Sequence, residues 1–163
     1  MNRTSMSEVA FEDTYRDLLP EVNDVVRRVM GSDISADDVV AETFARLHLN
    51  FRKVGEQETV DVWVLRAAIE LSLEADRTTG GIGSDFGTDH RSAMIALQRM
   101  PARPREALLL SYMTDRSDLE LARGLGLTER KFTSLTRTGL ALLRHYMTEE
   151  VAGATWEDDE AYE

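Results

Sequence analysis

Apolar residues recur every three or four positions through most of this chain, and no other feature constrains its fold as strongly. Between Phe11 and Val29 the spacing is unbroken, as expected for an amphipathic helix that buries one face. No segment alternates apolar and polar residues with the period of two that a half-buried strand requires. The sequence therefore predicts an all-α fold.

Turn-forming residues divide this pattern into separate helices. Pro20 should kink the first helix or restart it, because proline cannot donate the helical backbone hydrogen bond. Ser35 is the expected N-cap of the second helix, and three glycines within residues 80–83 follow the third. The predicted helices span about residues 11–29, 36–48, 60–77, 91–100, 106–113, 118–124 and 129–147.

The glycine-rich break suggests two small helical domains joined by a flexible tether. We place the first domain at residues 8–77, the linker at 78–89 and the second domain at 90–147. Residues 148–163 contain seven acidic residues and no basic one, so we expect an irregular acidic tail.

The charge of the chain differs sharply between these segments. The formal net charge of −11 argues against nucleic acid as a partner, because phosphate binding depends on Lys and Arg. However, residues 1–87 carry 9 basic and 17 acidic side chains, whereas residues 88–147 carry 10 basic and 6 acidic. A basic second half is compatible with nucleic-acid binding.

Several function classes are disfavoured by the composition. The chain contains no cysteine, so it has no disulfide and no thiolate metal site. His48, His90 and His145 lack metal-motif spacing, and residues 79–84 lack the Gly-Lys-Ser/Thr ending of a phosphate-binding loop. We expect neither an enzyme nor a bound cofactor or metal. No apolar stretch approaches the roughly 18 residues of a membrane span, so we expect a cytoplasmic protein without membrane association.

A short helix, a turn that contains glycine and a longer basic helix have the outline of a helix-turn-helix near the C-terminus. In this motif the N-terminal half of the second helix enters the major groove of DNA. An alternative is a plain surface helix with three positive charges. The candidate DNA-binding residues are Arg130, Lys131, Thr133, Ser134 and Arg137.

Taken in order, these segments resemble the sigma-70 family, specifically the short extracytoplasmic-function sigma factors made of regions 2 and 4. Residues 35–47, SADDVVAETFARL, resemble the region 2.2 helix, and residues 63–68, WVLRAA, resemble the stretch leading into the promoter-melting helix. Residues 96–110, ALQRMPARPREALLL, are similar to the start of region 4, and residues 121–128 to its helix-turn-helix. The resemblance covers about residues 11–147.

The resemblance implies a transcription initiation factor. Its partners would be core RNA polymerase, through the β′ coiled coil and the β flap, together with promoter DNA and an anti-sigma factor. An ordinary solvated helix face is the alternative for the acids of the second helix. The implied polymerase-binding residues are Asp37, Asp38, Glu42, Phe44 and Arg46, and the implied −10 residues are Trp63, Arg66 and Arg77.

Two departures from the family pattern leave other functions open. Glu70, Glu74 and Asp76 follow the tryptophan stretch, where carboxylates facing DNA would repel it. Positions that are commonly basic in the recognition helix of the family hold Thr133, Leu135 and Thr138 here. The chain could therefore be a sigma-like mimic that binds an anti-sigma factor or polymerase without opening promoters, or a regulator that uses only its helix-turn-helix.

The acidic tail has two interpretations. It could act only as a solubilising segment, or it could cover the basic helix of region 4 until polymerase or DNA displaces it.

Overall fold

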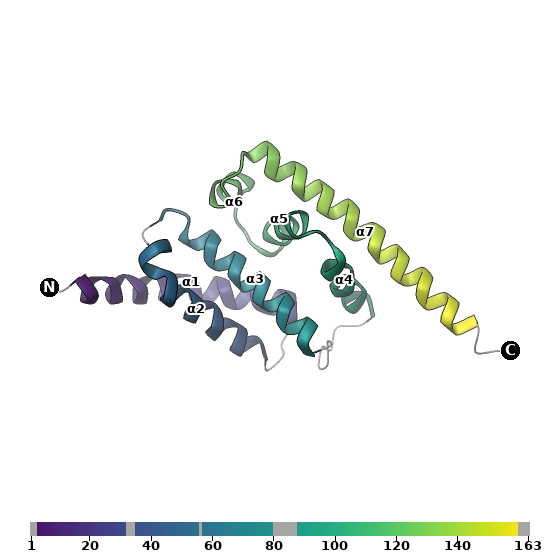
Figure 1. The fold of residues 1–163 in the computed structure, drawn as a ribbon, viewed down its shortest axis with the longest axis horizontal. Coiled ribbons are helices and arrows are strands. Elements are labelled where there is room, and N and C mark those ends of the chain that lie inside the picture. The colour runs from purple at the N-terminus through teal and green to yellow at the C-terminus, as the bar shows by residue number, and fades with distance from the viewer. Residues whose placement is uncertain (1–2, 32–34, 56, 80–87, 160–163) are drawn as a thin grey trace.

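A computed structural model describes the backbone of residues 3–31, 35–55, 57–79 and 88–159 (Figure 1). Side chains are described within residues 7–31, 35–55, 57–78 and 89–149. The protein is all-α, as predicted, and these residues contain no strand. The helices are α1 (Arg3–Met30), α2 (Ser35–Val54), α3 (Val60–Thr79), α4 (Thr88–Arg99), α5 (Ala102–Met113), α6 (Asp118–Gly124) and α7 (Glu129–Asp159).

Helices α1, α2 and α3 pack against one another through their apolar stripes. Helix α1 does not restart at Pro20 but runs through it as one element. The proline is exposed, and its neighbours Leu18 and Val22 still reach the core. Our predicted end of the second helix was wrong. Helix α2 ends at Val54 and not near residue 48, because Phe51 and Val54 continue the buried face of the helix.

Helices α4 to α7 form the other half of the molecule. Pro101 is the N-cap of α5, and Pro104 lies in its first turn, where the missing N–H costs nothing. Gly139 allows α7 to cross α5 closely, since a Cβ added there would lie 2.6 Å from the carbonyl oxygen of Pro104.

The segment expected to be an irregular tail continues α7 as helix to Asp159. Arg99 of α4 supports this extension, because its guanidinium bonds to Glu149 at 3.0 Å and lies 4.7 Å from the ring centre of Tyr146. At about 1.5 Å per residue, Thr148 lies roughly 16 Å beyond Arg137 along the same axis. The tail to Asp159 therefore extends away from the basic start of α7 and does not fold back over it.

The two halves lie in contact. Helix α3 packs against α1 and α2 on one side and against α4, α5 and α6 on the other. Buried side chains from every described helix join one apolar cluster. The division into two domains stays a prediction, and the core of the predicted linker, residues 80–87, lies outside the described residues. In the described part of the chain, no helix is both long and apolar enough to cross a membrane.

Candidate nucleic-acid interface

Local hydrogen bonds fix the start of α6 and the start of α7, and a glycine shapes the turn between them. The Ser117 hydroxyl accepts from the backbone N–H of Glu120 at 3.2 Å, and the Glu120 carboxylate accepts from the N–H of Ser117 at 2.9 Å. This capping box starts α6. Gly126 has φ +68°, the left-handed conformation that glycine tolerates, and Thr128 caps α7 by accepting from the N–H of Lys131 at 3.2 Å.

Hydrogen bonding within the capping box also affects the Glu120 carboxyl. Its pKa lies below the ordinary value because the backbone N–H and the hydroxyl of Ser117 both donate to the ionised form. The start of α6 is therefore best stabilised when Glu120 is charged.

Phe132 fixes which side of α7 faces outward. Its side chain is fully buried, and it packs in the apolar cluster with Leu121 and Ala122 of α6. The opposite side of α7 is open to solvent over the part whose side chains are described, which ends at Glu149. A basic helix that is anchored on the core by its other side can present its charged side to a partner.

Four of the five predicted DNA-binding residues lie on this open side. Arg130, Lys131, Ser134 and Arg137 are all exposed. Thr133 is half-buried and turned toward α6: its hydroxyl donates to the Glu129 carbonyl at 3.0 Å and lies 3.5 Å from a carboxylate oxygen of Asp118.

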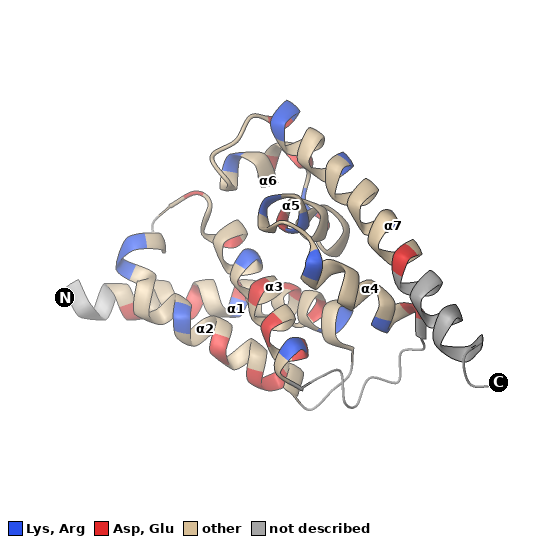
Figure 2. Ribbon diagram, turned by 45° about the vertical axis from the view of Figure 1, so that its right-hand side comes forward, with Lys and Arg blue, Asp and Glu red and all other residues tan. Residues whose placement is uncertain are grey.

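Sequence reasoning missed one member of the basic side, Arg144, which is also exposed. Arg130, Arg137 and Arg144 are spaced by seven residues, which is close to two helical turns, so they form one stripe along α7. We call these three residues the arginine stripe. Neighbouring members are separated by about 10 Å along the helix axis. Figure 2 shows Lys and Arg at the start of α7 and on α5 and α6, with Asp and Glu prominent on α2 and α3.

A second candidate surface lies between α2 and α3. Arg46, Asn50, Trp63, Arg66 and Glu70 line a groove of about 310 Å³. The structure thus brings a predicted polymerase-binding residue, Arg46, next to two predicted −10 residues. An aromatic ring beside guanidinium groups and an amide is the composition of sites that bind unpaired bases.

The two arginines that line this groove already form ion pairs with carboxylates of the chain. Arg46 bonds to Glu42 at 3.2 Å, and Arg66 lies 3.9 Å from Glu70 and pairs with Glu106 of α5. Of the three acids expected to repel DNA, Glu70 and Glu74 are exposed on α3, whereas Asp76 is half-buried.

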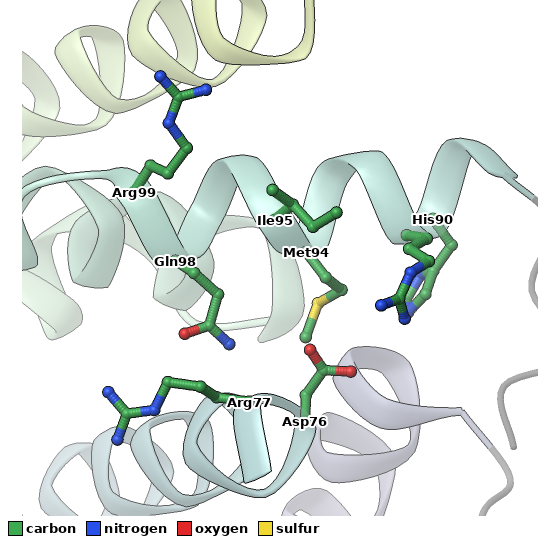
Figure 3. Close-up of a pocket in the computed structure, with 8 residues that line it drawn as sticks. Asp76, Arg77, His90, Met94, Ile95, Gln98 and Arg99 are labelled. Carbon is green, nitrogen blue, oxygen red and sulfur yellow. The ribbon is translucent and has the colours of Figure 1, made fainter. Parts of the chain in front are cut away.

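Arg77, the third predicted −10 residue, is not part of the groove. It lies about 21 Å along α3 from Trp63. There it lines a separate cavity of about 340 Å³ with Asp76 of α3 and with residues of α4, including Met94 and Ile95 (Figure 3). Arg99 borders this cavity but points toward α7.

The predicted polymerase-binding residues divide between the surface and the core. Asp37, Asp38 and Glu42 are exposed, and Asp37 bonds to Arg27 of α1 at 2.9 Å. Phe44, by contrast, is 4% exposed, and its ring centre lies 4.6 Å from that of Tyr15. Phe44 therefore positions α2 from within the core.

Sequence reasoning also missed an apolar groove beside these acids. It has a volume of about 530 Å³ and is lined by Phe11, Tyr15, Ala41, Phe44, Ala45, His48 and Leu49. Leu49 is 84% exposed. The four-residue spacing of Ala41, Ala45 and Leu49 was the signal that could have revealed this outer stripe.

Neither a scan against protein-family models nor a search of curated proteins found a match to this chain. Among the side chains that the structure describes, there is no group of three or more residues that could hold a metal ion.

Proposed function

We propose that this chain is a transcription initiation factor of the extracytoplasmic-function sigma type, which binds core RNA polymerase in the cytoplasm and directs it to promoters. The observation that carries the proposal is the arginine stripe, held outward by a capped helix-turn-helix that Phe132 anchors. Such a stripe suits the major groove of the −35 element, where arginine binds phosphate or guanine.

The outer face of α2 supports the polymerase-binding part of the proposal. Asp38 and Glu42 are exposed beside the apolar groove that contains Ala45 and Leu49. A surface with both carboxylates and apolar side chains fits a basic amphipathic helix. The β′ coiled coil of core polymerase is the partner that we assign to it.

The groove between α2 and α3 supports the part of the proposal in which the protein binds unpaired bases of an opened −10 element. Trp63 offers a ring on which an unpaired base can stack, and Arg46 and Arg66 offer positive charge for phosphates.

One observation favours a second function. Arg66 is paired with Glu106 and lies near Glu70, so the groove carries its own counter-charges. A sigma-like mimic would keep such pairs permanently. It would bind polymerase or an anti-sigma factor without opening promoters.

In vitro transcription with purified core polymerase and fragmented genomic DNA tests the proposal. Discrete promoter-dependent transcripts are expected, and changing Arg130, Arg137 and Arg144 together to Ala should abolish them. Arg16→Ala is the matched control, because it removes an exposed arginine of α1 that pairs with Asp13 nearby in the same helix. Co-purification of polymerase without transcripts would favour the mimic.

The docking surface is tested separately by co-purification. Glu42→Lys combined with Leu49→Asp should weaken polymerase binding at least tenfold, since it reverses one charge and places another in the apolar stripe. Asp24→Lys, an exposed change on α1, is the control for altered net charge. If polymerase retained the wild type, the double variant and Asp24→Lys equally, the assigned docking face would be contradicted.

A further inference from the structure

Arg116 joins the two halves of the molecule through carboxylates of α1 and α3. It lies in the turn between α5 and α6, and its Nε and Nη2 donate to the two carboxylate oxygens of Glu21 at 3.0 and 2.6 Å. Its Nη1 donates to Asp61 of α3. The three side chains are only 23–27% exposed. The hydrogen bonds from Arg116 to Glu21 raise the pKa of the guanidinium, which therefore stays charged.

A second ion pair joins the halves further along α3. Arg66 pairs with Glu106 of α5. Burial between the helices raises the pKa of the Glu106 carboxyl, although Arg66 acts in the opposite direction. The same contact therefore neutralises one of the cations that the α2–α3 groove would offer to DNA.

Close apolar packing lies between these two ion pairs. Gly124 at the end of α6 touches Val62, and a Cβ added to Gly124 would overlap the Val62 side chain. Further along α3, the Gln98 amide donates to the carbonyl oxygen of Leu73 at 2.9 Å. We call this set of contacts, from Asp61 to Leu73, the α3 seam.

The α3 seam is nevertheless incompletely packed. A cleft of about 480 Å³ lies among α3, α5 and α7, and its apolar walls include Ile69, Leu73, Leu109 and Leu135. Apolar side chains that face a gap lose the contacts that stabilise a continuous core. The two halves are thus joined both by ion pairs and by apolar side chains of one cluster. Interfaces between domains of one chain have this mixed composition, and such domains move relative to each other unless the interface is large and hydrophobic.

The seam also holds the two DNA-reading surfaces close together. Gly124 touches α3, and the five residues from there to the start of α7 span at most about 18 Å. The −10 and −35 elements lie about 25 base pairs apart by their names, which is roughly 85 Å of B-form DNA. Both elements cannot be read while the seam is closed.

We infer that the α3 seam is an autoinhibitory contact, in which Arg116 and the packing of Gly124 on Val62 hold the helix-turn-helix half against α3 until polymerase and DNA compete for it. This inference rests on the proposed function, because it assumes that α3 and α7 both read promoter DNA. The net charges of the sequence have the right sign for the contact, since residues 1–87 are acidic and residues 88–147 are basic.

Spin-label distance measurements test the inference on the full chain. Because the natural sequence has no cysteine, Ala10→Cys and Ala141→Cys place one label on an exposed site of each half. We expect one narrow distance population in this background. Arg116→Ala should raise the ratio of long to short distances roughly tenfold or more, because it removes charge-assisted hydrogen bonds from both carboxylates. Arg16→Ala should leave the distribution unchanged.

A second variant keeps the test decisive if Arg116→Ala fails to fold, as judged by circular dichroism. Gly124→Val places a side chain where Val62 of α3 already lies, and it should also lengthen the distances. Unchanged distances in every folded seam variant would overturn the inference. Longer distances in the seam variants, together with no transcript in the transcription assay, would support the seam and reject the promoter function. Transcripts together with unchanged distances would reject the seam and support the promoter function.

Discussion

Gly139 of α7 lies directly against the backbone carbonyl of Pro104, so that a Cβ on Gly139 would be 2.6 Å from the carbonyl oxygen. This contact sets how closely α7 crosses α5, and it explains a glycine in the middle of a long helix. A carbonyl in the first turn of a helix cannot swing aside as a flexible side chain can.

Gly139→Ala should therefore destabilise the protein by about 1–3 kcal/mol, although alanine is the better helix former. Urea unfolding followed by circular dichroism measures the change. Thr138→Ala, at the adjacent exposed position, should change stability by no more than about 0.5 kcal/mol. Equal stability of the two variants would show that the helices can separate without cost.

The arginine stripe predicts the salt dependence of DNA binding. If Arg130, Arg137 and Arg144 each neutralise one phosphate, replacing any of them with Ala should weaken binding and make the slope of log K against log salt less negative by about 1. Fluorescence anisotropy with duplex DNA at several salt concentrations gives that slope. Arg16→Ala should keep the wild-type slope, and a stripe variant that also keeps it would remove that arginine from the interface.

The burial of the Glu106 carboxyl predicts that the contribution of this residue to stability falls as the pH rises. The groups that face it are Arg66 and Glu70 of α3 and Arg103 of α5, and burial raises its pKa above the ordinary 4.5. Between 4.5 and that raised pKa, the folded protein binds more protons than the unfolded chain. The contribution of Glu106 to stability is therefore complete below pH 4.5 and is lost as the pH rises through the folded pKa.

Urea midpoints measured from pH 4 to pH 7 for the wild type and Glu106→Gln test this sign. The wild type should lose stability relative to the variant as the pH rises. Glu12→Gln removes an exposed carboxylate from α1 and serves as the control. If the urea midpoints of the wild type and Glu106→Gln differed by the same amount at every pH, the prediction would be contradicted.

The capping box predicts the stability of the helix-turn-helix. Ser117→Ala removes the hydroxyl that accepts from the N–H of Glu120, so it should destabilise the protein by about 1 kcal/mol. Hydrogen exchange should show the loss first in the amides of α6. Ser117→Asp retains an acceptor oxygen and should restore most of the stability. If Ser117→Asp were as unstable as Ser117→Ala, the hydroxyl would not act as a cap.

Local sequence signals determined most of the secondary structure. The three- and four-residue apolar spacing predicted the all-α fold, and turn-forming residues placed most helix ends within a few residues. These signals work because capping and amphipathic spacing act between neighbours in the chain. They failed at the end of α2 and at the tail, where Phe51 and Arg99 extend helices through contacts with distant residues.

The tertiary structure alone decided which surfaces meet. Spacing marks Thr133 and Arg137 as members of one helix, but only packing turns Thr133 toward α6 and leaves Arg137 exposed. The pairing of Arg116 with Glu21, 95 residues away, has no local signal at all. Many charged residues in this chain could pair, and the choice among them depends on which helix faces lie together once the apolar stripes are buried.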